Sequence, residues 1–246
     1  MDTQDFQRLV EAGIDKCRHG KFEDALSLFN DAEKIGLSES LLYNRSKAYF
    51  KLRKLDDATQ DLNQLIEIQP DNSVWYAERA VIYHYREDKD KALADLDKAA
   101  DLDPENGFRF ASRAFIKDFY GDHQGALEDY EKAIELDPED AISHNNKGLV
   151  EEKLGYKARA KASFSRADKL DPIKKGHFNP NLNSTTNPQP SSRPKDNLNV
   201  EKPKTVGKKK SSMTFEHYID TLGEVTTSKK GAKSFLNFVF GKKDNS

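Results

Sequence analysis

The chain has 246 residues, of which 36% are hydrophobic and 33% are charged. This apolar content is low for one round core of that length, and it favours an elongated or partly disordered protein. The single cysteine, Cys17, excludes an internal disulfide framework. The first residues have neither the basic nor the apolar region of a signal peptide, and no run approaches the roughly 20 apolar residues of a membrane-spanning helix. We therefore expect an intracellular, cytoplasmic protein that does not cross a bilayer.

The net charge of −2 conceals an asymmetry between the two ends of the chain. Residues 172–246 contain 14 Lys and Arg against 6 Asp and Glu, a balance of +8. Residues 1–171 keep 26 basic against 36 acidic residues, a balance of −10. This arrangement favours contact between the two halves, or contact of the basic tail with phosphate or an anionic membrane. Because the acidic part would repel phosphate, we expect no specific nucleic-acid partner.

Similar segments ending in proline recur along the chain. Pro70, Pro104, Pro138 and Pro172 follow one another at steps of 34 residues. Apolar residues between them have helical spacing, and each proline ends the second of two helices. Alanines recurring at steps of 33, 34, 34 and 34 add a less regular unit at the start. These alanines are Ala25, Ala58, Ala92, Ala126 and Ala160.

Glycines and size-matched residues predict how each unit folds back on itself. Gly20, Gly121 and Gly155 are placed to end the first helix of their units in the left-handed conformation. Small residues in each first helix recur opposite larger residues in the second, which predicts small-against-large packing. The small residues are Gly13, Ser46, Ala80, Ala114 and Gly148, and the larger ones are Phe29, Leu62, Leu96, Tyr130 and Phe164.

The 34-residue period, the two helices per unit and the ordered small, alanine, aromatic and proline positions together resemble the tetratricopeptide repeat family. The resemblance covers about residues 6–172 and implies an all-α, right-handed superhelical solenoid of about five helix-turn-helix hairpins within residues 1–173. The family usually has an aromatic residue in the middle of the first helix. Lys16, Lys117 and Glu151 depart from this pattern, so we expect looser packing there. The units are about 6–38, 39–72, 73–106, 107–140 and 141–173.

Arginines at one place in the first helix of the middle units are matched by aspartates sixteen residues later. The outer units lose both members together, because they have Ala12 with Leu28 and Lys147 with Ser163. We predict an ion pair inside each middle hairpin, and the alternative is a chance arrangement of surface charges. The pairs are Arg45 with Asp61, Arg79 with Asp95, and Arg113 with Asp129.

The resemblance implies that the first helices line a concave groove, where the family binds extended or helical peptides. Phe108, Phe115 and Phe119 form a second apolar stripe on one helix, which is either covered by neighbouring repeats or exposed for a ligand. These three residues, with Tyr43 and Tyr85, are the expected anchors. The expected groove residues are Val10, Ile14, Tyr43, Asn44, Lys47, Phe50, Val74, Ala77, Val81, Tyr85, Phe108, Ala111, Phe115, Phe119, Asn145 and Leu149.

One subclass of the family holds the acidic C-terminus of cytosolic chaperones with a carboxylate clamp. The stretch LLYNRSKAY, residues 41–49, resembles its second repeat, and Asn44 falls on a clamp asparagine. One polar group cannot neutralise a terminal carboxylate, so a co-chaperone role is disfavoured. The four other clamp places hold Val10, Ile14, Val74 and Glu78.

The repeat pattern stops after Pro172. Residues 174–211 are rich in Asn, Pro, Ser and Lys and are predicted to be a disordered linker. Residues 212–246 are predicted to be a basic tail with one or two short amphipathic helices, which would be marginal without a docking surface. That surface is the solenoid itself, an anionic membrane for the cationic segment 229–243, or a partner protein. The docking faces are Phe215, Tyr218, Ile219 and Leu222, then Phe235, Leu236, Val239 and Phe240.

Catalytic patterns are missing from the sequence. It contains no Gly-rich phosphate loop, no nucleophile elbow and no pair of metal ligands at helical spacing, and its six histidines are scattered. We therefore expect no enzymatic activity, no cofactor and no metal. The favoured function is a protein–protein interaction scaffold or adaptor that binds a peptide or helix in the groove and is regulated by its own tail. The alternatives are a peripheral membrane tether and a structural unit that stacks end to end.

Overall fold

The computed structural model describes residues 3–170, and these residues form ten α-helices and no strands. Consecutive helices pair into five hairpins, and each hairpin packs against the next. The predicted all-α solenoid is therefore confirmed for this part of the chain, whereas the predicted linker and tail lie outside it. The helices are α1 (Thr3–Arg18), α2 (Phe22–Glu33), α3 (Glu39–Lys51), α4 (Leu55–Ile68), α5 (Ser73–Tyr85), α6 (Lys89–Leu102), α7 (Gly107–Phe119), α8 (His123–Leu136), α9 (Ala141–Lys153) and α10 (Lys157–Leu170).

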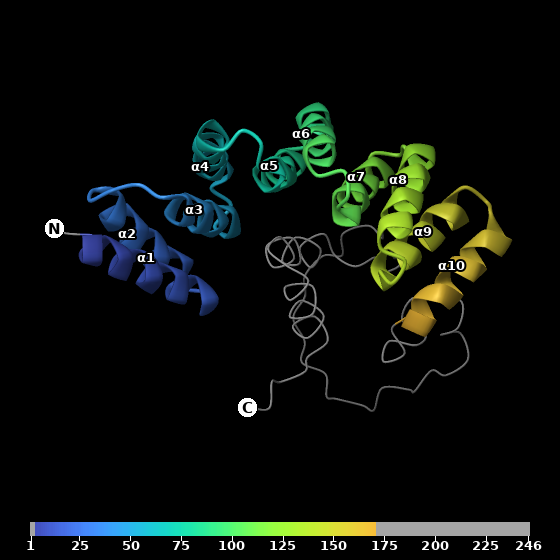
Figure 1. Cartoon of the computed structure of the whole chain (residues 1–246), viewed down its shortest axis with the longest axis horizontal. Helices are drawn as coiled ribbons and strands as arrows, with labels where there is room; N and C mark the ends of the chain where they lie inside the picture. The colour runs from blue at the N-terminus through green and yellow to red at the C-terminus, as the bar shows by residue number, and fades with distance from the viewer. Residues whose placement is uncertain (1–2, 171–246) are drawn as a thin grey trace, which may run out of the picture.

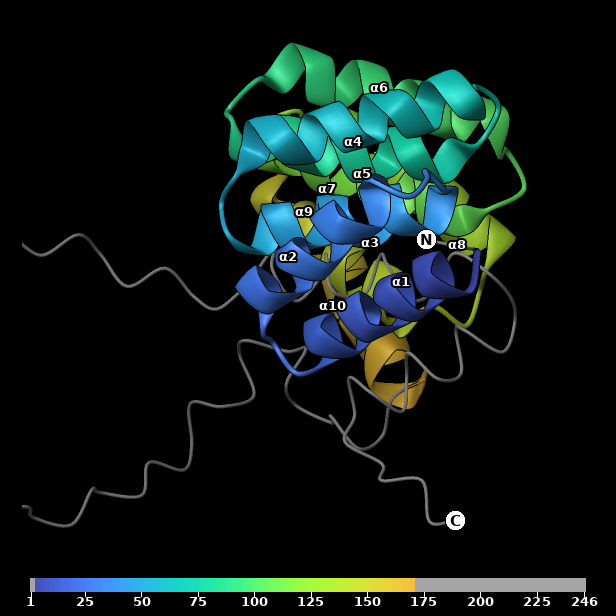
Figure 2. The ribbon, with the colours of Figure 1, turned by 90° about the vertical axis from the view of Figure 1, so that its left-hand side faces the viewer.

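The hairpins follow one another along an arc (Figure 1). Helices α3, α5 and α7 lie on its inner side, while α4, α6 and α8 lie on its outer side. Figure 2 views the stack from its N-terminal end and shows α4 and α6 outside α3 and α5. The first helices of the three middle repeats therefore line the concave side of the arc.

The turn inside each hairpin contains a residue with left-handed backbone. Gly20, Gly121 and Gly155 have φ values of +70°, +88° and +82°, as predicted. Arg53 and Glu87 take the same place in the second and third hairpins, both with φ of 60°. A side chain in this conformation costs about 1 kcal/mol, so packing around these two turns must compensate.

Polar side chains define where the later inner helices begin. Asn72 accepts a hydrogen bond from the Val74 amide at 3.1 Å, and Asn106 accepts one from the Phe108 amide at 3.1 Å. These caps satisfy N–H groups that have no partner within the helix. They place the first apolar residue of α5 and of α7 at the start of the concave face.

The predicted small-against-large packing is confirmed at both ends of the stack. A Cβ atom on Gly13 would lie 2.5 Å from the Phe29 ring, and one on Gly148 would lie 2.7 Å from the Phe164 ring. Both phenylalanines are buried, with 0% and 2% of their surface exposed. Glycine at these two positions therefore lets the two helices of a hairpin approach closely.

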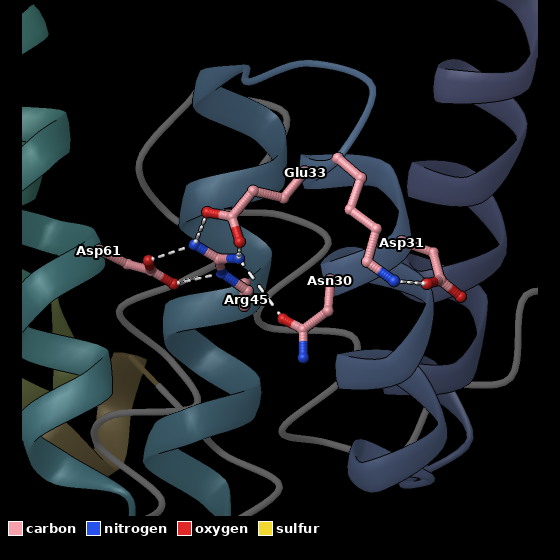
Figure 3. Close-up of polar contacts among 6 residues, drawn as sticks. Asn30, Asp31, Glu33, Arg45 and Asp61 are labelled. Carbon is pink, nitrogen blue, oxygen red and sulfur yellow. Dashed lines mark hydrogen bonds and ion pairs between the residues drawn. The ribbon is translucent and has the colours of Figure 1, made fainter. Parts of the chain in front are cut away.

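The predicted arginine–aspartate pairs are also confirmed, and each one does more than join its own hairpin. Arg45 on α3 donates from Nε and Nη2 to both carboxylate oxygens of Asp61 on α4, at 2.9 and 2.8 Å. It also contacts Glu33 on α2, with Nη1 to Oε2 at 2.7 Å, as Figure 3 shows. One guanidinium group therefore connects three helices from two consecutive hairpins.

The same arrangement recurs in the next two hairpins. Arg79 binds Asp95 twice at 2.8 Å and donates to Asn63 of the preceding hairpin at 2.7 Å. Arg113 binds its own aspartate at 2.8 and 2.7 Å and also contacts a carboxylate of the preceding hairpin at 2.8 Å. We refer to the three arginines and their partners as the arginine ladder. The partners of Arg113 are Asp129 in its own hairpin and Asp97 in the preceding one.

The three places that lack the family's usual aromatic residue hold ion pairs. Lys117 lies 2.8 Å from Asp129, and Lys16 lies 3.6 Å from Asp24. The expectation of looser packing is wrong for Glu151, because its side chain is only 1% exposed. Its carboxylate accepts hydrogen bonds from Ser163 and Arg159 on α10 at 2.7 and 3.1 Å, and Lys147 lies 3.7 Å away.

Candidate functional site

A row of rings connects α3, α5 and α7. The Phe50 and Tyr85 centroids are 4.9 Å apart, with ring planes at 80°. The His84 ring lies 6.1 Å from Tyr85 and 4.5 Å from Phe119, also edge to face. Such edge-to-face pairs contribute about 0.5–1.5 kcal/mol each beyond their buried area. We refer to Phe50, His84, Tyr85 and Phe119 as the aromatic row.

The second stripe predicted on α7 is partly covered and partly open. Phe108 and Phe115 are half-buried and pack on Val81 of the preceding repeat. Phe119 is 62% exposed, more than any other large apolar side chain of residues 3–170. Burial of an exposed phenylalanine ring is favourable in water, so Phe119 is suited to contact another molecule.

The other residues expected in the groove divide by burial. Ile14, Tyr43, Asn44, Lys47, Phe50, Val74, Tyr85 and Leu149 are half-buried on the first helices. The rest are closed to a ligand in this arrangement because neighbouring helices cover them. These residues are Val10, Ala77, Val81, Ala111 and Asn145.

A polar contact crosses between α3 and α5 beside the aromatic row. The Tyr43 hydroxyl donates to Glu78 at 3.0 Å, and the Lys47 ammonium lies 5.2 Å from the centre of the Tyr43 ring. Burial raises the pKa of Glu78, although Lys47, Tyr43 and Arg109 act to lower it. Burial, followed by the nearby Glu78 carboxylate, raises the pKa of Tyr43. This pair therefore ties the second repeat to the third.

Cations border the aromatic row. The Arg53 guanidinium lies 4.6 Å from the centre of the Tyr85 ring, and the Lys89 ammonium lies 5.7 Å from that of Tyr120. Tyr120 in turn packs edge to face on Phe119, with centroids 5.2 Å apart. Rings under cations are a favourable arrangement worth about 0.5–1 kcal/mol where solvent reaches them.

Several carboxylates near this edge have basic partners, and two more, Glu87 and Asp88, lie close enough to Tyr120 to add to the rise that burial causes in its pKa. Asp118 binds His123 at 2.8 Å and Lys153 at 2.5 Å, and Asp56 binds Arg86 at 2.6 Å. An acidic ligand at the row would therefore meet cations, together with carboxylates whose charge is partly neutralised.

His84 behaves as an apolar member of the row. Its ring is buried, with Nδ1 3.3 Å from the Tyr120 hydroxyl oxygen. Burial lowers the pKa of His84 to about 4, so the imidazole is neutral near pH 7. Half-burial similarly raises the pKa of the Cys17 thiol, which disfavours the reactive thiolate.

The carboxylate clamp of chaperone-binding relatives is not formed. The Asn44 side-chain amide donates to the Ser40 carbonyl of its own helix at 2.8 Å. Glu78 places a carboxylate where the clamp requires a cation. A terminal carboxylate would be repelled there.

Residues 3–170 contain no group of three or more side chains arranged to hold a metal ion, and none of their helices has the length and apolar character to cross a membrane. The predicted docking faces of the tail and the cationic segment 229–243 lie outside the described residues.

Comparison with protein families matches the repeat pattern directly. The tetratricopeptide repeat profile matches residues 39–72, 76–106 and 141–174, and a related TPR repeat profile matches residues 120–155. The chain is a tetratricopeptide-repeat protein. Members of this family act as scaffolds for protein–protein interaction. Human sperm-associated antigen 1 is 32% identical over 83 residues, which are 33% of this chain and 9% of that protein. The chain therefore spans less than a tenth of that relative's length.

Solved structures share the architecture of these repeats. A crystal structure of MamA has 22% identity and a TM-score of 0.59, covering 71% of this chain and 97% of MamA. MamA from Desulfovibrio magneticus RS-1 has 16% identity and a TM-score of 0.61, covering 69% of this chain and 97% of that one. At these identities the likeness shows a common fold.

Proposed function

We propose that this protein is an adaptor whose concave face binds a peptide or an amphipathic helix of a partner protein. The exposed ring of Phe119, at the end of a row of rings that crosses three repeats, carries this proposal. Family membership supports binding of another polypeptide in general. The aromatic row supplies the place where such a polypeptide would gain most from burial.

The row suits a ligand that presents apolar side chains along one side. Phe50, Tyr85 and Phe119 come from three consecutive inner helices, so a ligand must run across the repeats to contact them all. Burying one aromatic ring fully contributes about 1.5–3 kcal/mol. Two or three such contacts add up to about 3–9 kcal/mol before the cost of association, so a stable complex needs further contacts along the ligand.

Peptides selected from a random library against the full chain test the proposal. We expect that most selected peptides contain aromatic or branched apolar residues at helical spacing. Their affinity for Phe119→Ala should fall about tenfold, because truncation of one anchor removes about 1.4 kcal/mol. Isothermal calorimetry measures this difference.

Tyr156→Ala is the matched control, because Tyr156 is another exposed aromatic residue, 42% exposed, in the turn between α9 and α10. Circular dichroism checks that both variants remain folded. Peptides that bind wild type and Phe119→Ala equally well, or that lose affinity for Tyr156→Ala instead, would exclude the aromatic row as the binding site.

A further inference from the structure

We propose that residues 214–224 of this chain occupy the aromatic row, so that the adaptor is capped by its own tail until a partner displaces it. This inference rests on the proposed function, because tail and partner would compete for one surface. It also chooses between the two amphipathic segments of the tail, which differ in charge. The choice follows from the cations that border the row.

The chosen segment combines an apolar face with an acidic one. Phe215, Ile219 and Leu222 follow helical spacing and, together with Tyr218, would fall on one side of a helix. Its three carboxylates recur at steps of four residues, which places them along an adjacent side. These acidic residues are Glu216, Asp220 and Glu224.

Charge complementarity favours this segment over the second one. An apolar side chain of the ligand that reaches Tyr85 or Phe119 brings the neighbouring side chains close to Arg53 and Lys89, which lie over rings of this region. Arg53 and Lys89 attract carboxylates and repel ammonium groups, and Glu87 and Asp88 beside Tyr120 offset part of this preference. Segment 229–243 carries five lysines and no acidic residue, so it fits this edge poorly.

The distribution of charge over the whole chain supports the same arrangement. Residues 1–171 have a balance of −10, although cations gather beside the aromatic row. The acidic segment within 214–224 interrupts a tail whose overall balance is +8. Docking of that segment at the row leaves the lysine-rich stretches on either side of it to face the acidic remainder of the solenoid.

The length of chain between the two parts permits the contact. Leu170 ends α10, and 43 residues separate it from Thr214. Treated as a random coil, such a chain has an end-to-end distance of roughly 35 Å, and the tail then has an effective concentration near the millimolar range. A segment with a dissociation constant of about 100 μM would therefore occupy the row most of the time.

A labelled peptide with the sequence of residues 211–226, added to the full chain, tests the inference by competition. Two tail variants are compared with wild type by fluorescence anisotropy. Phe215→Ala with Ile219→Ala removes the proposed internal competitor, and Phe235→Ala with Val239→Ala is the matched control in the other segment. We expect the added peptide to bind the first variant about tenfold more tightly than wild type, while the control binds it as wild type does.

The contribution of the acidic residues to binding is tested by substitutions in the peptide, because these cannot affect folding of the protein. A version with Glu216→Gln, Asp220→Asn and Glu224→Gln should bind the Phe215→Ala, Ile219→Ala chain several-fold more weakly. Its affinity should also depend less on salt. Adding Phe119→Ala to the Phe215→Ala, Ile219→Ala chain should weaken binding of the original peptide about tenfold.

Several results would overturn the inference. One is equal affinity of the 211–226 peptide for wild type and for the Phe215→Ala, Ile219→Ala variant. Another is a 229–243 peptide that binds more tightly than the 211–226 peptide. A third is a Phe235→Ala, Val239→Ala control that binds the 211–226 peptide more tightly than wild type does. The difference in peptide affinity between wild type and the tail variant could also disappear when the protein is diluted. If the mass measured by sedimentation then depends on concentration, the tail of a second copy occupies the row instead. If library peptides still require Phe119 in these cases, the proposed function stands and self-capping fails.

Discussion

Polar contacts join each repeat to the next, and we call each such contact a joint. The joints formed by Arg45, Arg79 and Arg113, here the middle joints, have the opposite charge pattern to the last joint, between the fourth and fifth repeats. In the middle joints a cation on the inner helix binds a carboxylate of its own hairpin and a polar side chain of the preceding outer helix, as Arg45 binds Asp61 and Glu33. In the last joint the buried group is an anion on the inner helix, Glu151. Its carboxylate accepts hydrogen bonds from Ser163 and Arg159 of its own hairpin. Arg159 and Lys147 then reach Glu131 of the preceding repeat at 2.7 and 3.3 Å.

The comparison shows that a joint requires a complementary group linking the hairpins, whichever helix supplies each sign. It also explains why the fifth repeat could lose both the arginine and the aspartate without losing the fold. A buried charge is tolerated only when partners satisfy it, and both patterns meet that condition.

Asp61→Ala should give the largest effect, because it leaves the Arg45 guanidinium, whose side chain is 5% exposed, without its bidentate partner. Loss of one partner from a buried ion pair costs several kcal/mol, and Glu33 remains to compensate in part. We therefore expect a loss of about 3 kcal/mol in the free energy of unfolding. Urea denaturation followed by Trp75 fluorescence measures it.

Asp97→Ala is the matched control within the same ladder, since its side chain is 58% exposed. We expect a change below about 1 kcal/mol. Similar losses for Asp61→Ala and Asp97→Ala would show that burial of the pair does not determine its contribution to stability.

Glu151→Gln tests the opposite joint. The substitution keeps the shape but removes the charge that binds Arg159 and Lys147, and we expect a loss of about 2 kcal/mol. Glu152→Gln, one residue along and half-buried, should change stability by less than about 0.5 kcal/mol. Thermal unfolding by circular dichroism separates the two variants.

A triple substitution tests whether the two charge patterns are interchangeable. Glu151→Tyr combined with Lys147→Arg and Ser163→Asp gives the last joint the middle pattern, and it should recover most of the stability lost in Glu151→Gln. A triple variant less stable than Glu151→Gln would mean that the two joints are not interchangeable.

Gly148→Ala should have a smaller effect, because the added methyl would lie 2.7 Å from the Phe164 ring. Overpacking costs about 1–3 kcal/mol, and the better helix propensity of alanine offsets about 1 kcal/mol of it. We expect a net loss of about 1 kcal/mol by thermal denaturation. Phe164→Leu in the same chain should restore most of it, since the third hairpin combines Ala80 with Leu96. A gain in stability from Gly148→Ala alone would contradict the close packing.

Much of this fold could be predicted because it repeats. Helix order, the glycine turns and the Arg45–Asp61 type of pair all follow from features that recur at a constant spacing. The left-handed turns at Arg53 and Glu87 could not be predicted, because no glycine marks them. The partners of the ladder in the preceding hairpin also escaped prediction, since Glu33, Asn63 and Asp97 differ in chemical type.

The candidate site was less predictable than the fold. Family positions identified most of the inner-helix residues, but burial depends on how one hairpin stacks on the next. Val81 is covered for this reason, while Phe119 is exposed. The Tyr43–Glu78 contact crosses two repeats and has no counterpart at a repeated spacing. In the sequence alone, Glu78 stands out only as a mismatch to the chaperone clamp.

The guanidinium bridges have a consequence for the mechanics of recognition. Each one contacts an outer helix of one hairpin and both helices of the next, so it favours one angle between consecutive repeats. The rings of Phe50, Tyr85 and Phe119 therefore keep their mutual spacing before any ligand arrives. An incoming polypeptide would meet a rigid template, and the entropy lost on binding would fall on the ligand rather than on the repeats.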